Sequence, residues 1–321
     1  MLDRMHKLSV IVTVYKNENN LMPFYEDFLK NIAPFIDDYE IIMVNDCSPD
    51  DSWRVMSELA NKDAKVKIVK LTRNFGAIAA SFTGLKYATG DCATIKAADL
   101  QEPAQLTLDM YQKWKEGNKS VIAVRSGRND SAISNIFSNM YYYGVRKMIT
   151  SSMPKGGFDT YLIDRSIIND LIRLNDRNAP ITLQLLWMGC GECKVYYERL
   201  ERKIGRSSWT FSKKFNLLMD SFIGFSYKPI RIMTVVGLVY ALLSIGYAIH
   251  MAISGLMGKV DVQGFTTLIV IISFSAGVIM FSLGILGEYI WRTLDSARNR
   301  PISIVEETVN FDKDMLDGKE I

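Results

Sequence analysis

Hydrophobic residues in the first two thirds of the chain form short continuous runs, separated by segments with helical spacing. Five runs rich in Val and Ile predict strands, at 8–15, 39–44, 66–71, 92–95 and 120–125. The segments between them have the apolar periodicity of helices, at 20–32, 52–60, 77–88 and 103–116. Continuously apolar strands that alternate with helices are typical of a parallel sheet covered on both faces. We therefore predict an α/β domain with a Rossmann-like, mostly parallel sheet over residues 1–210.

The segments that follow four of these strands are polar. They read KNENN at 16–20, NDCSPDDS at 45–52, TRNFG at 72–76 and ADLQE at 98–102. Each has an ordinary reading when taken alone, because Asp and Ser cap helices and Asn-Phe-Gly can form a turn. Ligands of open α/β sheets bind outside the carboxyl ends of the strands, so four polar loops at that edge indicate a binding site. Neither GxxxxGK[ST] nor GxGxxG occurs, which argues against a P-loop and a classical dinucleotide site.

Two long segments without charged residues lie in the last third of the chain, at 232–249 and 265–287. Each is long enough to cross a hydrocarbon core of about 30 Å. Lys and Arg flank the pair on both outer sides, so the positive-inside rule places these flanks and the N-terminal domain in the cytoplasm. Just before them, 212–226 has apolar residues at helical spacing and two lysines, which predicts an interfacial helix lying on the bilayer. The alternatives are buried core helices for the two long segments and for 212–226.

These patterns divide the chain into four parts. They are a globular domain at 1–210, an interfacial amphipathic region at 211–229, two transmembrane helices within 230–291 and a cytoplasmic C-terminal tail at 292–321. The formal net charge of +3 is too small to favour nucleic acid as a partner. With only two histidines, His6 and His250, a Ser-His-Asp triad and an HExxH zinc site are disfavoured. Cys190 and Cys193 form a lone CxxC, which we interpret as reduced structural thiols.

The loop carboxylates indicate a substrate that carries a metal and phosphates, because Mg²⁺ is commonly held by one or two carboxylates together with phosphate oxygens. Sugar transfer from a nucleotide-sugar needs only carboxylates, cations and a metal. It requires a positioned nucleophile and positive charge against a diphosphate leaving group. A membrane-anchored domain would meet its acceptor at the level of the lipid headgroups.

Motifs along almost the whole chain resemble those of family 2 glycosyltransferases of the GT-A fold. The similarity is to the polyprenyl-phosphate group, which is dolichol-phosphate mannose synthase-like, GtrB-like and ArnC-like. The motifs are VTVYKNENNL at 12–21, VNDCSPDDS at 44–52, TRNFG at 72–76, ADLQEP at 98–103, VRSGR at 124–128, GGFDTYLIDR at 156–165, RKIGRSSW at 202–209 and GEYIWRTLDSARNRPISIV at 287–305.

The resemblance implies roles for individual residues. It implies that Asp99 and Asp159 are the catalytic residues, with Asp159 orienting the acceptor more than removing a proton. Asp99 and Gln101 match the metal and diphosphate loop, which implies Mg²⁺ or Mn²⁺. The positions implied for nucleotide binding are Thr13, Tyr15, Glu18, Asp46, Arg73, Gly76, Asp99 and Gln101. Those implied for the lipid phosphate and the diphosphate are Arg125, Arg128, Arg202 and Ser207.

The implied activity is transfer of a sugar, with inversion, from a nucleotide-sugar to polyprenyl (undecaprenyl) phosphate for a cell-envelope glycan or lipid. A UDP-linked donor is favoured. The resemblance also implies a multi-pass protein of the bacterial inner membrane that contacts membrane lipids and forms a homotetramer. Its catalytic domain and both termini would be cytoplasmic, and nucleic acid is not an expected partner.

Some positions depart from the family pattern. The usual Asp-Ala-Asp of the metal loop is replaced by Ala97-Ala98-Asp99, and Thr13 stands where proline is usual. The loss of one carboxylate leaves an alternative open, namely a non-catalytic homologue that binds nucleotide or lipid beside another membrane protein. A processive polysaccharide synthase fits less well, because 202–209 lacks a QxxRW motif. For an active enzyme, we expect Asp99 to hold the metal weakly without substrate and well only with nucleotide-sugar bound.

Overall fold

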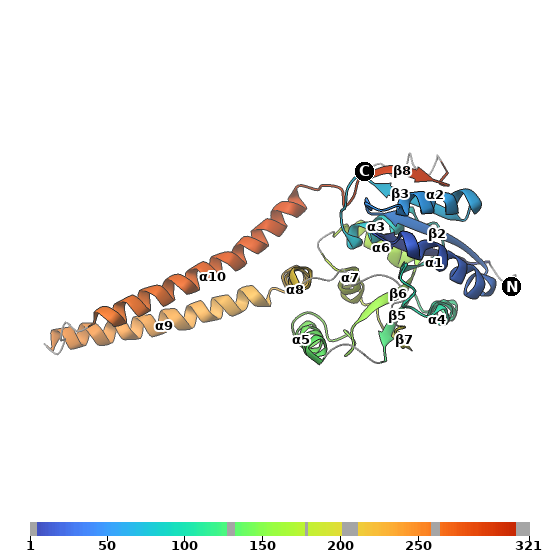
Figure 1. Cartoon of the computed structure of the whole chain (residues 1–321). Helices are drawn as coiled ribbons and strands as arrows, with labels where there is room; N and C mark the ends of the chain where they lie inside the picture. Colours follow the sequence, from blue (N-terminus) through green and yellow to red (C-terminus); the bar gives the residue numbers. More distant parts are fainter. Residues whose placement is uncertain (1–4, 127–131, 177–178, 201–210, 258–263, 313–321) are drawn as a thin grey trace. The chain divides into compact units, whose positions relative to one another are not determined.

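The computed structural model describes residues 5–126, 132–176, 179–200, 211–257 and 264–312. The chain divides into two compact units, one of Met1–Ser221 with Pro301–Ile321 and one of Phe222–Arg300. The first unit contains an eight-stranded sheet in the order β7-β5-β6-β4-β1-β2-β3-β8 (Figure 1). Its strands are β1 (Lys7–Val14), β2 (Asp38–Asn45), β3 (Val66–Leu71), β4 (Cys92–Ala97), β5 (Ser120–Arg125), β6 (Phe158–Asp164), β7 (Cys193–Tyr197) and β8 (Val305–Val309).

The centre of the sheet is parallel, as the apolar strand pattern predicts. β1 pairs in parallel with β2 and β4, and β2 pairs in parallel with β3. On one side β6 runs antiparallel to both β4 and β5, while β7 is parallel to β5. On the other side β8 runs antiparallel to β3. The five predicted strands are confirmed to within a few residues. β6, β7 and β8 are further strands of the same sheet.

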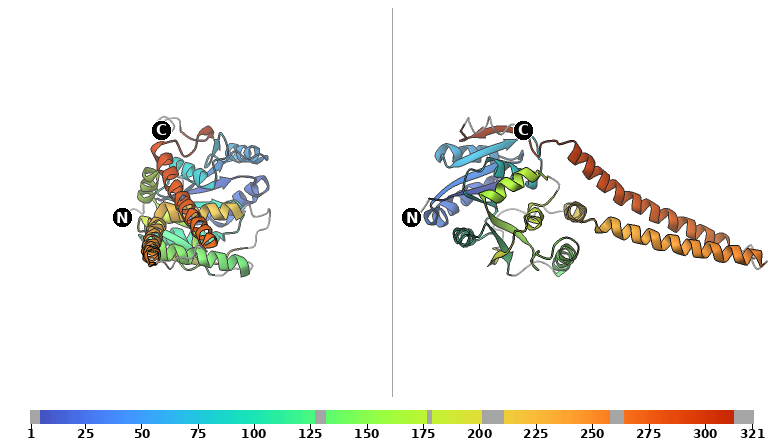
Figure 2. Two further views of the ribbon diagram at one scale, coloured as in Figure 1. Left: turned by 90° about the vertical axis from the view of Figure 1, so that its left-hand side faces the viewer. Right: turned by 180° about the vertical axis from the view of Figure 1, so that it is seen from behind.

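Helices cover the sheet on both faces. α1 (Glu18–Asn31), α2 (Ser52–Lys62) and α4 (Ala104–Lys115) pack against one face, whereas α3 (Ala77–Tyr87) and α6 (Arg165–Leu174) cover the other (Figures 1 and 2). The described residues of the first unit also contain the short η1 (Ala33–Phe35) and the helices α5 (Ala132–Met148) and α7 (Ile181–Trp187), and α8 (Phe211–Phe225) begins in this unit. A Cβ atom at Gly84 would lie 2.3 Å from Ile11 Cγ2, so glycine lets α3 pack closely on β1.

A buried carboxylate joins the first three strands. Glu40 on β2 is 1% exposed, and its oxygens lie 2.8 Å from Lys67 Nζ on β3 and 3.1 Å from Lys7 Nζ on β1. The Ser9 hydroxyl donates to the same carboxylate at 2.7 Å, and the Thr89 N–H donates at 2.6 Å. Glu40 therefore connects β1, β2, β3 and the turn before β4 through charge-assisted hydrogen bonds.

The second unit is a hairpin of two long helices, α9 (Lys228–Leu256) and α10 (Phe265–Ala297) (Figure 1). Segments Lys228–Tyr247 and Val270–Ala297 are long and apolar enough to cross a membrane, and none of either is buried. A helix that is apolar all round and uncovered by protein needs an apolar environment. The hydroxyls of Tyr240 on α9 and Ser275 on α10 form a hydrogen bond between the helices. The Tyr289 hydroxyl on α10 donates at 2.7 Å to the carbonyl of Ser226, which lies two residues before α9.

The segment predicted as a C-terminal tail, 292–321, contributes β8 to the sheet. Asn310 Nδ2 donates to the carbonyls of Ala60 and Val66 at 2.7 and 2.8 Å, just beyond the end of β8. Lys70 and Glu306 form an ion pair of 2.9 Å across the β3–β8 ladder. The chain thus returns to the first unit after α10, a long-range contact that the local sequence pattern does not encode.

Candidate active site

Three neighbouring parallel strands, β1, β2 and β4, end in loops at the same edge of the sheet. Each loop contains one non-glycine residue with positive φ, namely Lys16 (58°), Cys47 (52°) and Leu100 (54°). Such residues are uncommon, and strained backbone persists only where the surrounding structure holds it. Their coincidence at one edge supports the interpretation of this edge as the functional site.

Asp46 organises the loop that follows β3. It lies directly after β2 and is 4% exposed. Its two carboxylate oxygens accept hydrogen bonds from the backbone N–H groups of Phe75, at 2.6 Å, and Gly76, at 2.9 Å. Gly76 has φ of 97°, which disfavours other residues there. Burial raises the pKa of Asp46 above its ordinary value, and the two N–H donors offset part of that effect. Both carboxylate oxygens of Asp46, a predicted nucleotide-binding residue, therefore hold the 72–76 loop in its conformation.

The other predicted nucleotide-binding residues occupy the rim of the same edge. The Arg73 guanidinium lies over the Phe75 ring at 4.0 Å, and Tyr15 is 41% exposed with Lys16 Nζ 5.6 Å from its ring centre. Glu18 accepts a hydrogen bond of 2.8 Å from the Asp51 N–H, so its carboxylate joins the first loop to the second. Thr13 is half-buried in β1, paired with β2 and β4.

The loop after β4 carries the two predicted metal-binding residues, and the structure engages them differently. Asp99 is half-exposed and accepts from the Gln101 N–H at 3.3 Å. The Gln101 side chain accepts from Arg199 and donates to the Leu200 carbonyl at 3.3 Å, while its own carbonyl accepts from the Leu200 N–H at 2.9 Å. Gln101 therefore joins the loop to the segment after β7. Asp99 is the better candidate for direct contact with a ligand.

Lys96 does not add charge to the surface of this loop, although it is only three residues from Asp99. It is 4% exposed, and its ammonium lies 2.8 Å from Thr107 Oγ1 and 3.3 Å from Glu102 Oε2. Glu102 in turn accepts a hydrogen bond from the Thr160 hydroxyl on β6. The lysine and the glutamate neutralise each other beneath the loop. In the sequence, the only indication of this pair is that Lys96 is a charged residue within the otherwise uncharged run of β4.

Arg125, Asp159 and Tyr197 meet where β5, β6 and β7 reach this edge. Arg125 forms an ion pair with Asp159, and its Nε lies 3.4 Å from the Tyr197 hydroxyl, which donates to Asp159 at 3.3 Å. The β5–β6 register shifts between Ala123 and Val124, so Asp159 is the extra residue of a β-bulge. Bulges re-aim side chains and are frequent beside active sites. Sequence reasoning had named the arginine and the aspartate but had missed Tyr197.

The electrostatics of this cluster follow from burial and pairing. Burial and the neighbouring Asp159 raise the pKa of Tyr197 to about 12, so its hydroxyl is protonated and can donate at neutral pH. The Asp159 side chain is 51% exposed, whereas that of Arg125 is 15% exposed. The Arg125 side chain is therefore largely buried, whereas the Asp159 carboxylate is open to solvent. Three further predicted ligands, Arg128, Arg202 and Ser207, lie outside the described residues.

A divalent ion fits this donor set only with help from a substrate. Within the described ranges, no group of three or more His, Cys, Asp or Glu residues could hold a metal ion. Asp99 supplies a single carboxylate, which suits Mg²⁺ bound mainly by water and phosphate oxygens.

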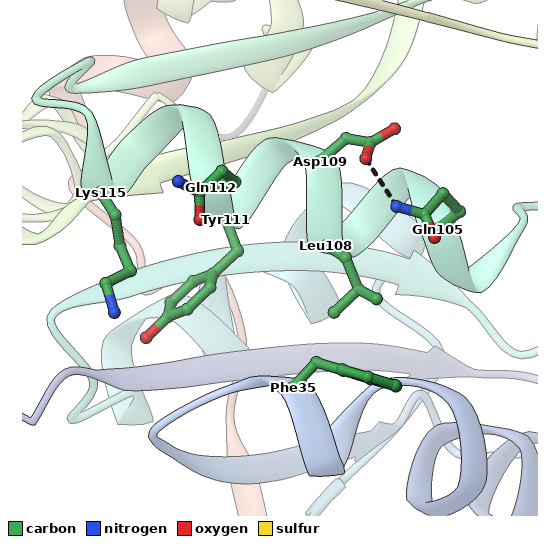
Figure 3. A pocket seen from close by; sticks show the side chains of 7 residues that line it. All are labelled: Phe35, Gln105, Leu108, Asp109, Tyr111, Gln112 and Lys115. Atoms are coloured by element: carbon green, nitrogen blue, oxygen red, sulfur yellow. Dashed lines mark hydrogen bonds between the residues drawn. The ribbon is translucent and has the colours of Figure 1, made fainter.

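A groove of about 280 Å³ lies between η1 and α4, lined by Phe35 and by α4 side chains between Gln105 and Lys115 (Figure 3). Gln105 donates to Asp109 there at 2.7 Å. None of the predicted site residues lines this groove.

Comparisons with known proteins agree with this architecture. Residues 9–172 match glycosyl transferase family 2, and residues 228–292 match the GtrB C-terminal hairpin. The chain belongs to glycosyl transferase family 2 and is a glycosyltransferase, which confirms the predicted family, GT-A fold and enzyme class.

Its relatives share nearly its whole length. The chain is 33% identical to a putative glycosyltransferase, CsbB, of Bacillus subtilis, over 98% of this chain and 95% of the relative. It is 32% identical to the SfII prophage-derived bactoprenol glucosyl transferase of Shigella flexneri, over 94% and 98%. Among solved structures it is similar to a mannosyltransferase of Pyrobaculum calidifontis in complex with GDP-Man and Mn²⁺, at 13% identity and a TM-score of 0.47, covering 91% and 87%.

Proposed function

We propose that this enzyme transfers a sugar from a UDP-linked nucleotide-sugar to polyprenyl phosphate, with inversion, at the cytoplasmic face of the bacterial inner membrane. The observation that carries the proposal is the Arg125–Asp159–Tyr197 cluster at the same sheet edge as the Asp99 loop. A cation beside the diphosphate loop suits an anionic acceptor. Relatives named as bactoprenol glucosyl transferases and the match to the GtrB hairpin support this acceptor and the two membrane spans.

In this proposal each part of the edge has one task. The loops after β1, β2 and β3 bind the nucleotide, and Asp99 faces the diphosphate. The Arg125 guanidinium binds the acceptor phosphate, since its planar donors match phosphate oxygens. Asp99 would hold Mg²⁺ or Mn²⁺, which when bound supplies positive charge against the leaving diphosphate. The homotetramer, the cell-envelope product and the role of Arg128, Arg202 and Ser207 at the phosphates stay predictions.

Asp159 positions the acceptor-binding arginine in this mechanism. Its two oxygens accept hydrogen bonds from Arg125 and Tyr197, so the carboxylate is engaged in holding these two side chains. An acceptor phosphate is anionic at neutral pH and needs no base. The nucleophilic phosphate oxygen attacks the anomeric carbon directly, and the bond to the nucleoside diphosphate breaks in the same step.

The first test is a donor screen. Purified protein is incubated with undecaprenyl phosphate and, in turn, UDP-Glc, UDP-GlcNAc, UDP-Gal and GDP-Man, and the lipid product is identified by mass. We expect a lipid-linked sugar from a UDP-sugar and release of UDP that requires the lipid phosphate. Product from GDP-Man alone would correct the donor, and no lipid product from any donor would contradict the proposal.

Two variants of the cluster separate phosphate binding from proton transfer. Arg125→Met is expected to lower kcat/KM for undecaprenyl phosphate by about 100-fold, through loss of a charge-assisted phosphate contact. The KM for the nucleotide-sugar should change little. For Asp159→Asn we expect lower activity with a pH profile of unchanged shape. Disappearance of an acidic limb in that variant would instead identify Asp159 as a general base.

A further inference from the structure

The segment that follows α10 contacts the first residue of the 72–76 loop and the helix that follows this loop. The Ile304 carbonyl accepts a hydrogen bond of 3.0 Å from the N–H of Thr72, the first residue of the loop. The adjacent Ser303 hydroxyl lies 2.6 Å from the Thr83 hydroxyl on α3, the helix that begins directly after the loop. Two consecutive residues, Ser303 and Ile304, therefore fix the start of the loop and the helix into which the loop leads.

The hydrogen-bond chemistry at Thr83 assigns the direction of this contact. Thr83 is 4% exposed, and its hydroxyl donates to the Ala79 carbonyl at 2.8 Å. A hydroxyl has one proton to donate, so Ser303 is the donor to Thr83. Removing the serine hydroxyl leaves a buried acceptor without this donor, which costs more than loss of an exposed hydrogen bond.

A β-bulge sets the register that makes the backbone contact possible. In the β3–β8 ladder Lys70 is opposite Glu307, but the next residue, Leu71, is opposite Val305. β8 thus contains one extra residue, Glu306, which forms the ion pair with Lys70. The shift places Ile304 opposite Thr72, where its carbonyl can accept from the loop.

The loop that these contacts fix is the one that Asp46 organises. Its Phe75 and Gly76 N–H groups donate to the Asp46 carboxylate, and Arg73 extends from it over the Phe75 ring. Hydrogen bonds therefore fix the loop at Thr72, through Ile304, and at Phe75 and Gly76, through Asp46, and the backbone of 72–76 joins the two points. We expect a change in the returning segment to reach the candidate nucleotide site through this backbone.

We propose that Ser303 and Ile304 are positioning residues for the donor nucleotide, and that they act by holding the 72–76 loop against Asp46. This proposal deepens the proposed function and rests on it for the identity of the ligand. The part that concerns the loop itself stands on the contacts alone. The returning segment is then a component of the donor site, in addition to being the edge of the sheet.

The test compares Ser303→Ala with Asn310→Ala in the full-length protein. Both remove one side-chain hydrogen-bonding group from the same returning segment, but Asn310 bonds to Ala60 and Val66 carbonyls rather than to the loop or α3. Amide hydrogen exchange is measured on peptides that contain 72–76, and UDP and GDP affinities are measured by calorimetry. We expect Ser303→Ala to speed exchange in the loop and to weaken UDP binding by about 5- to 10-fold, a loss equal to one hydrogen bond.

The control outcome separates positioning from general destabilisation. Asn310→Ala should lower the unfolding temperature while leaving loop exchange and UDP affinity unchanged. Thr83→Val should weaken UDP binding as Ser303→Ala does, and the double variant should be no worse than either single one. Equal loop exchange in Ser303→Ala and wild type would overturn the proposal. Faster loop exchange in a protein that binds neither UDP nor GDP would confirm the positioning and contradict the proposed donor.

Discussion

Replacing Asp99 by Asn is expected to lower sugar transfer by about 100- to 1,000-fold, the loss typical when one charge-stabilising group is removed from an active site. Asp99 lies at the carboxyl end of the central β4, and its carboxylate is half-exposed at the edge where the other candidate loops meet. Asparagine keeps the size of the side chain and its capacity to accept from the Gln101 N–H. Loss of activity would therefore report loss of the negative charge. The measurement is UDP release together with formation of the lipid-linked sugar.

A matched control is Asp109→Asn on α4. Asp109 likewise accepts a hydrogen bond from a nearby residue, Gln105, and it lines the groove between η1 and α4, which no predicted site residue lines (Figure 3). Its replacement should leave turnover unchanged. If Asp99→Asn retained activity within about threefold of wild type, the charge of Asp99 would have no role in sugar transfer. That activity would still exclude the alternative of a non-catalytic homologue. Mn²⁺ affinity, measured with and without UDP, should fall in the variant only when UDP is present.

Replacing Glu40 by Gln is expected to destabilise the first unit by about 3 kcal/mol, because breaking a buried charge pair leaves its partner uncompensated. The Lys67 side chain is 14% exposed and would face a neutral amide in place of the carboxylate. Denaturant unfolding of the detergent-solubilised protein measures the change. The control is Glu58→Gln on the surface of α2, where Glu58 pairs with the exposed Arg54. The control should unfold at the wild-type midpoint.

The pH dependence of the free energy of unfolding gives an independent test of the stabilising role of Glu40. Burial by itself would raise its pKa, but Lys67, Ser9 and Thr89 outweigh burial and lower the pKa to about 2. A carboxyl group whose pKa is lower in the folded state stabilises the fold fully above its unfolded value, which is 4.5. That contribution is lost as the pH falls from about 4.5 towards 2. Wild type should lose stability over this window more steeply than Glu40→Gln, and parallel curves would contradict the assignment.

Much of the fold was predictable because its signals are local. The strand runs near β1 to β5 are continuous in the sequence, and burial on both faces of a parallel sheet requires that composition. The two apolar helices were equally plain, since their length and lack of charge stand out in any window. The antiparallel β8 was missed because its sequence, VEETV, has three consecutive polar residues between two valines, and none of its residues is buried at the sheet edge.

The site was predictable in its components and unpredictable in its contacts. The positions of Asp99, Asp159 and Arg125 followed from motifs, but the polar neighbours that the sequence grouped as ligands have other partners in the fold. Glu18 bonds to the second loop and Gln101 to the segment after β7. A pattern of residue types cannot predict which polar atoms form hydrogen bonds within the protein, because these bonds join loops that meet only after folding.

The sequence by itself determined the α/β sheet, the polar strand-end loops and the apolar hairpin, because these are encoded by nearby residues, and its motifs carried the resemblance that implied the class of enzyme. Only the tertiary structure decided that Lys96 is neutralised by Glu102 beneath the Asp99 loop, and that Ser303 and Ile304 contact α3 and the loop that begins at Thr72. The latter contacts join residues more than two hundred positions apart. Their formation depends on the register of β8 against β3, which the bulge at Glu306 sets and no local pattern reveals.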